Sequence, residues 1–155
     1  MVESSVEICE AEEKHALIIG NSLGDPFLPT VREDVRAVEA FTRRNRFDSV
    51  TVLRDDQATT NAVLGFFTEQ GGRCFQHSQK NSNKRYLLMV FYAGHGNLTY
   101  GTQHVSLHDN DSYELEIKIR NFKNDFVKNA YVWGVFDTCR SVQAPINQKV
   151  RAGGQ

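Results

Sequence analysis

The sequence predicts a three-layer α/β domain, flavodoxin-like in outline, in which helices cover both faces of a mostly parallel β-sheet. Segments typical of strands alternate along the chain with segments whose hydrophobic residues recur at helical spacing. Two of these segments, 86–92 and 131–136, are continuously hydrophobic, as in strands that are covered on both faces. Parallel strands need long crossover connections, and the helices between them would therefore lie against the sheet.

The first half of the chain contains two predicted strands and two predicted helices. The strands are expected at 15–20 and 49–53. Between them, Thr30 and Glu33 form a capping-box pattern that would start a helix, and the helix should end near Arg44. A second helix is expected to begin near Thr59 or Thr60 and to be interrupted at Gly71-Gly72.

The second half carries the two hydrophobic strands. A polar loop over 79–85 leads into the first of them, and Tyr100-Gly101-Thr102 predicts a small hairpin turn after it. A third helix is expected over 114–128, with its inward face formed by Ile119, Phe122 and Phe126. The chain divides into an acidic, flexible extension (1–14), a folded domain (15–141) and a loop or linker tail (142–155).

Composition excludes several functional classes. With 155 residues, of which 40% are hydrophobic and 24% charged, the chain is sized for one soluble domain. Its net charge of −1 gives no basic footprint for nucleic acid or for a membrane surface, and no apolar run is long enough to span a membrane. The acidic start lacks a signal-peptide core, which predicts a cytoplasmic protein. Three cysteines without metal-ligand spacing favour a single functional thiol over disulfides.

A histidine and a cysteine follow the two hydrophobic strands. His95 lies in Ala93-Gly94-His95-Gly96, and Cys139 lies in Asp137-Thr138-Cys139-Arg140. The carboxyl ends of parallel strands form the edge at which α/β sheets bind ligands, so the two residues should meet there. An imidazole can activate a cysteine thiolate, and the backbone amides of Gly96 and Cys139 would form an oxyanion hole. Either residue alone is more often structural; together they favour a catalytic pair.

These two motifs resemble those of the caspase-like cysteine peptidases, the clan of caspases, metacaspases and paracaspases. The similarity runs from about His15 to Ser141, which corresponds to the large-subunit catalytic region. The resemblance implies a caspase-like fold and a His95–Cys139 dyad. It also implies peptide or protein substrates, and no cofactor.

Differences within the motifs indicate which subfamily of this clan the chain resembles most. Caspases that cut after aspartate have a glutamine two residues before the cysteine, where this chain has Asp137, and an arginine near the position of Leu28. Metacaspases and paracaspases have aspartate at the first position and cut after arginine or lysine. Asp34 matches a second acidic residue of their specificity pocket, although a carboxylate in the first turn of a helix is also favoured by the helix dipole. Ala93 and the Arg140-Ser141 pair are closer to paracaspases.

Further features of the clan are only weakly represented. Many metacaspases bind calcium through an acidic run after the histidine motif, of which Asp109 and Asp111 would be a remnant. The small-subunit region is expected to be absent, which leaves a sheet edge for that region or for a second copy of the chain. A caspase-fold interaction module or pseudoprotease is therefore a second hypothesis. A nucleotide-binding domain is a third, suggested by Gly20 to Gly24, but the phosphate-binding patterns are missing.

Overall fold

The fold is described from a computed structural model, which describes residues 11–80, 85–125 and 130–140. Its elements in chain order are β1 (Ala11–Asn21), α2 (Thr30–Arg44), β2 (Ser49–Arg54), the 3₁₀ turn η1 (Asp55–Gln57), α3 (Thr60–Lys80), β3 (Arg85–Thr99), β4 (Thr102–Leu107), β5 (Asn110–Tyr113), α4 (Leu115–Asp125) and β6 (Ala130–Arg140). The sheet has six strands.

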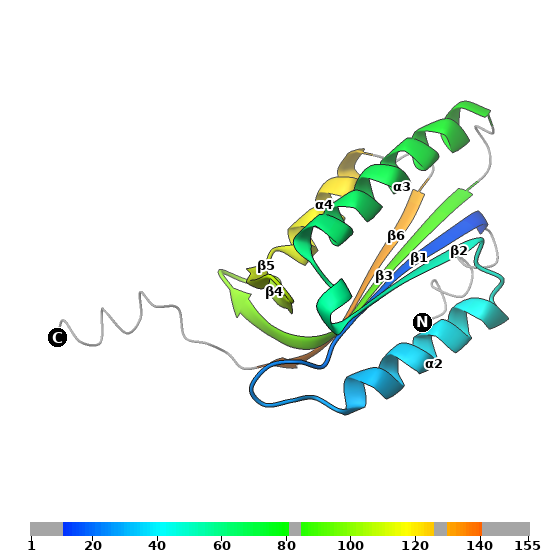
Figure 1. Ribbon diagram of the computed structural model, residues 1–155. Coiled ribbons are helices and arrows are strands. Elements are labelled where there is room, and N and C mark those ends of the chain that lie inside the picture. The colour runs from blue at the N-terminus through cyan, green and yellow to red at the C-terminus, as the bar shows by residue number, and fades with distance from the viewer. Residues whose placement is uncertain (1–10, 81–84, 126–129, 141–155) are drawn as a thin grey trace.

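The main part of the sheet is parallel, as predicted. Strand β1 pairs with both β2 and β3, and β6 pairs with the other edge of β3, so the spatial order is β2-β1-β3-β6. Beyond its pairing with β1, β3 continues into an antiparallel hairpin with β4, and β4 pairs with β5. Helix α2 lies on one face, while α3 and α4 lie on the other (Figure 1). The α/β three-layer prediction is confirmed.

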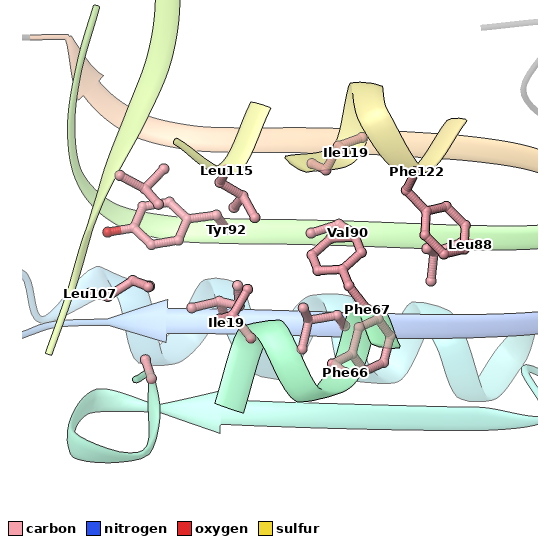
Figure 2. Packing of buried hydrophobic residues seen from close by; sticks show 14 of the residues in the cluster. Ile19, Phe66, Phe67, Leu88, Val90, Tyr92, Leu107, Leu115, Ile119 and Phe122 are labelled. Carbon is pink, nitrogen blue, oxygen red and sulfur yellow. The ribbon is translucent and has the colours of Figure 1, made fainter. Parts of the chain in front are cut away.

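The core fills the space between the sheet and these helices. Every residue from Tyr86 to Ala93 is buried, which confirms that β3 is covered on both faces. On the α3 and α4 face, Phe67 of α3 packs near Phe122 of α4, above Val90 of the sheet (Figure 2). On the other face a smaller cluster joins α2 to β1 and β3. This two-sided burial stabilises the central strands and holds their carboxyl ends in place.

Two predictions about helices are wrong. Pro29, not Thr30, occupies the N-cap of α2, and no side-chain hydrogen bond caps the helix. The φ of −64° and ψ of −28° at Pro29 already match a helix, so Thr30 becomes its first residue. Helix α3 also runs through Gly71-Gly72 without interruption. Each glycine costs about 1 kcal/mol in a helix, but the buried Phe66, Phe67 and Cys74 hold the helix to the sheet on either side.

Other boundaries shift by a few residues. Strand β1 begins at Ala11, inside the segment expected as a flexible extension. The hairpin turn at Tyr100-Gly101 is confirmed, and both residues have positive φ. Helix α4 is described as far as Asp125, with Ile119 and Phe122 buried as predicted, whereas Phe126 lies outside the described residues. Strands β3 and β6 extend to Thr99 and Arg140, so His95 and Cys139 belong to the strands themselves.

Candidate active site

His95 and Cys139 lie on neighbouring parallel strands. The register of β3 and β6 pairs His95 with Cys139, and it pairs Ala93 with Asp137 two residues earlier. Paired Cα atoms on adjacent strands are about 5 Å apart, so both positions occupy one spot at the carboxyl edge of the sheet. The Cys139 side chain lies outside the described part of the structure, and the backbone register is what locates this residue.

The His95 ring is held by the loop that joins β1 to α2. Its Nε2 lies 2.7 Å from the backbone carbonyl oxygen of Pro26. A carbonyl can only accept a hydrogen bond, so Nε2 carries the hydrogen and donates it. In the neutral imidazole this leaves Nδ1 unprotonated, and Nδ1 is then the nitrogen that can take up a proton.

Gly24 packs directly on the same ring. A Cβ added at Gly24 would lie 2.9 Å from His95 Cδ2 and 3.1 Å from Nε2, closer than any side chain could be accommodated. The φ of Gly24 is +126°, a conformation that favours glycine. His95 is therefore positioned on one side by a glycine and at Nε2 by a backbone carbonyl, while its ring remains partly exposed.

The base of this loop is tied to the end of β2. Asp55 Oδ1 accepts hydrogen bonds from the Ser22 backbone amide (2.8 Å) and from the Ser22 hydroxyl (2.6 Å). The Leu28 amide in turn donates to the Ser22 carbonyl (2.9 Å), which closes the loop. The amide of Leu23 donates to Asn21 Oδ1 (3.2 Å). Because these amides are already used, the segment from Gly20 to Gly24 is not a phosphate cradle, which counts against the nucleotide-binding hypothesis.

Tyr92 supports the backbone of His95 from the opposite face of the sheet. Its hydroxyl lies 2.8 Å from the His95 carbonyl oxygen and 2.6 Å from the Ser106 carbonyl oxygen. Asn21 Nδ2 donates to the same Ser106 oxygen (3.0 Å). Burial raises the pKa of Tyr92, so its hydroxyl stays protonated and remains a donor. This network fixes the point at which β3 leaves β1 and turns toward the hairpin.

Gly96 has no room for a side chain. A Cβ at this position would lie 2.7 Å from Gln103 Nε2, 2.8 Å from Thr138 Cγ2 and 2.9 Å from the backbone oxygen of His104. The β3 backbone is therefore closely flanked by β4 on one side and by β6 on the other. The close approach of these neighbouring atoms explains why position 96 needs a glycine, independently of any role of its backbone amide in an oxyanion hole.

Asp34 and Asp137 are brought together from two distant elements. Asp34 lies in the first half of α2, and Asp137 lies on β6 two residues before Cys139. Burial raises the pKa of Asp34, and a hydrogen bond to the Asp137 carboxyl raises it further. In the described residues no lysine or arginine forms an ion pair with either carboxyl. A cationic side chain bound beside these two carboxyls would favour their ionised forms, and the proton would be released to solvent.

The family follows from a comparison of the whole sequence. Residues 13–153 match the family model described as the caspase domain. The chain belongs to the caspase domain family. This family is one of caspase-like cysteine peptidases, and the match covers every element described above except the first two residues of β1. No curated protein matches the chain closely enough to add a relative.

Of the two remaining acidic candidates of this caspase domain, Asp109 has a structural role. Asp109 Oδ1 accepts hydrogen bonds from the backbone amide (2.9 Å) and the hydroxyl (3.0 Å) of Thr60, the first residue of α3. Asp109 thus caps α3 across the domain, and Asp111 is exposed. Within the described ranges, no group of three or more His, Cys, Asp or Glu side chains could hold a metal ion. Calcium dependence of this caspase domain stays a prediction from the resemblance.

The structure adds site residues that the sequence did not reveal. The carbonyl of Pro26, the α-carbon of Gly24 and the hydroxyl of Tyr92 all position His95. The first two are backbone features, and the sequence marked them only as part of a loop. Tyr92 looked like one more hydrophobic residue of a buried strand. Among the described helices of this caspase domain, none has the length and apolar character of a membrane span.

Proposed function

We propose that this caspase domain is a cysteine endopeptidase in which His95 and Cys139 form the catalytic dyad. The observation that carries the proposal is the register of β3 and β6, which pairs these two residues at the carboxyl edge of the sheet. The hydrogen bond from His95 Nε2 to Pro26 supports it, because it leaves Nδ1 as the basic nitrogen.

In the proposed reaction, His95 Nδ1 accepts the proton of the Cys139 thiol. The thiolate attacks the carbonyl carbon of the scissile peptide bond, and the backbone amides of Gly96 and Cys139 donate hydrogen bonds to the developing oxyanion. The imidazolium then gives its proton to the leaving amine as the carbon–nitrogen bond breaks. Water, deprotonated by the same histidine, hydrolyses the thioester and regenerates the thiol.

The proposed substrates carry arginine, and less favourably lysine, before the scissile bond. A guanidinium can pair with a carboxylate through two charge-assisted hydrogen bonds, whereas an ammonium makes a point contact. Asp34 and Asp137 supply two carboxyls that have no cationic partner in the described part of the chain. An aspartate in the same place would be repelled. This preference is that of metacaspases and paracaspases, with which the motifs agree.

A partner strand along β6 is part of the proposal. Among the described elements β6 pairs only with β3, so its outer edge has no neighbour, and Val135 is 45% exposed. A cavity of about 650 Å³ adjoins this edge between β6 and α4, lined in part by Gly134, Phe136 and Ile119. A small-subunit region or a second copy of the chain would cover this surface. The same observation favours the alternative, an interaction module with little activity of its own.

Labelling with a basic peptide fluoromethylketone tests the proposed function. We expect covalent modification of Cys139, detected by peptide mass spectrometry, and no modification of Cys9 or Cys74. Burial raises the pKa of the Cys74 thiol to about 11, so it serves as an internal control for nonspecific alkylation. Labelling should disappear in Cys139→Ala and His95→Ala. Absence of Cys139 labelling when the chain is folded and a partner segment is supplied would favour the interaction module instead.

A further inference from the structure

A second pocket lies on the other flank of α2, away from the acidic pair. It has a volume of about 250 Å³ and opens between α2 and the ends of β1 and β2. Three guanidinium groups line it: Arg32 and Arg36 from α2, and Arg54 from the last position of β2. We propose that this pocket is a subsite for a small anion carrying a carboxylate or phosphate group, with Arg36 as its principal contact.

The arginines in this pocket are not equally available. Arg32 lies 3.8 Å from Asp55 and also faces the ring of Phe27 at 5.6 Å. Arg54 forms an ion pair with Glu39. Arg36 has no ion pair, hydrogen bond or ring contact with any described residue, although it lines the same pocket. Two of the three cations therefore have an acidic partner, whereas Arg36 has none among the described residues.

The floor of the pocket is apolar and closely packed. Gly20 of β1 lies under α2 so closely that an added Cβ would be 2.4 Å from Val35 Cγ2. Val31 and Val35, both buried, complete this floor. An anion that rests on an apolar floor is partly shielded from water, and its attraction to a nearby guanidinium is stronger there than in bulk solvent. Guanidinium groups also match the geometry of carboxylate and phosphate oxygens.

Helix α2 thus separates two regions of opposite charge. Asp34 meets Asp137 on the side of β6, whereas Arg32 and Arg36 meet Arg54 on the side of β2. The pocket shares no residue with the proposed dyad or with the acidic pair. Its one acidic lining residue, Asp55, also holds Ser22 at the base of the loop that positions His95. Anion binding and peptide cleavage are therefore distinct properties, which can be measured separately.

Isothermal titration calorimetry at low ionic strength tests the proposal. Inorganic phosphate and succinate are titrated into the full chain and into Arg36→Gln, Arg36→Lys and Arg43→Gln. Arg43 is an exposed arginine in the last turn of α2 that does not line the pocket, so it controls for the change in net charge. We expect saturable binding of at least one anion, and the stronger of the two identifies the preferred group.

In Arg36→Gln the affinity should fall at least about tenfold, as is typical when a charge-assisted hydrogen bond is lost. Arg36→Lys should bind with intermediate affinity, Arg43→Gln should bind like the wild type, and added salt should weaken binding. Circular dichroism checks that each variant is folded. The proposal is overturned if neither anion binds saturably, or if Arg36→Gln binds as tightly as Arg43→Gln.

Discussion

The carboxyl groups of Asp34 on α2 and Asp137 on β6 interact with each other, although 102 residues separate them in the sequence. Burial raises the pKa of Asp34, and the neighbouring Asp137 carboxyl raises it further, because two carboxylates in contact repel each other. A guanidinium placed between them would remove the repulsion and allow both groups to ionise. The pair is therefore better suited to receiving a cationic side chain than to stabilising the fold.

Asp137→Asn is expected to reduce cleavage after arginine by tens-fold or more in kcat/KM, because a bound arginine side chain would cover this exposed carboxyl, and the loss of a covered charge partner costs about 2–5 kcal/mol. Lysyl peptides should lose less, since a point charge depends less on two aligned oxygens. A peptide library assayed on wild type and Asp137→Asn measures both effects. If Asp137 only supports the loop, the thermal stability will change and the preference for arginine will not. Efficient cleavage after aspartate by the wild type would refute the proposed specificity.

Asp34→Asn should flatten the dependence of stability on pH. The folded-state pKa of Asp34 lies above its ordinary value of 3.8, so the folded protein binds this proton more tightly than the unfolded chain does. The resulting stabilisation is fully present below pH 3.8 and is lost as the pH rises through the folded-state pKa. Urea unfolding from pH 3 to 7 measures it. Asp56→Asn, at an exposed carboxyl, is the control; an equal effect there would contradict the prediction.

Gly24→Ala should impair turnover more than it impairs stability. The added Cβ would contact the His95 ring at 2.9 Å and displace it from Pro26, and the φ of +126° would add backbone strain. Gly101→Ala is the matched control, because Gly101 also has positive φ (+74°) but has no atom within 4 Å of an added Cβ. Steady-state kinetics and thermal melts on both variants separate the two effects. Equal losses of turnover would mean that backbone strain alone is responsible.

Asp109→Ala should destabilise the domain, because Thr60 at the start of α3 would lose the acceptor of two hydrogen bonds. The hydrogen bond from the Thr60 amide lowers the pKa of Asp109, so its stabilisation is present above pH 3.8 and is lost as the pH falls through the lower folded-state value. Asp111→Ala, also at an exposed aspartate, is expected to be neutral in the same urea titration. An equal loss of stability in Asp109→Ala and Asp111→Ala would indicate a role shared by the two aspartates instead of a helix cap at Asp109.

The chain is expected to associate through β6 and to be weakly active while this edge is uncovered. Gel filtration with light scattering measures association, and Val135→Lys should suppress it, since lysine on an edge strand opposes strand pairing. Val50→Lys is the control on the opposite edge strand, β2, where the side chain is 36% exposed. A chain that is strictly monomeric and fully active would contradict this prediction. If both variants suppress association equally, β6 is not the specific contact.

The layered α/β fold and the positions of the two motifs could be predicted from the order of residues alone. Continuous hydrophobicity in 86–92 marked a strand covered on both faces, and the parallel order then placed His95 and Cys139 at the same edge of the sheet. Both inferences rest on the spacing of hydrophobic residues and on strand geometry, which depend on residues that are close together in the sequence. The predicted helix boundaries were less accurate. Gly71 indicated a break, but the packing of α3 keeps that helix continuous. Thr30 indicated an N-cap, but Pro29 occupies that position.

The contacts that hold His95 and the pairing of charged side chains could not be predicted in this way, because they depend on long-range packing. The contact with Pro26 joins a side chain to a backbone carbonyl 69 residues away, and every residue has such a carbonyl, so no residue type marks it. Asp34 and Asp137 were each candidates, but their interaction depends on the packing that brings the first half of α2 near the end of β6. The separation of Arg36 from these acids depends on the same packing. Local sequence specifies the elements, whereas long-range contacts set the distances on which charge and proton transfer depend.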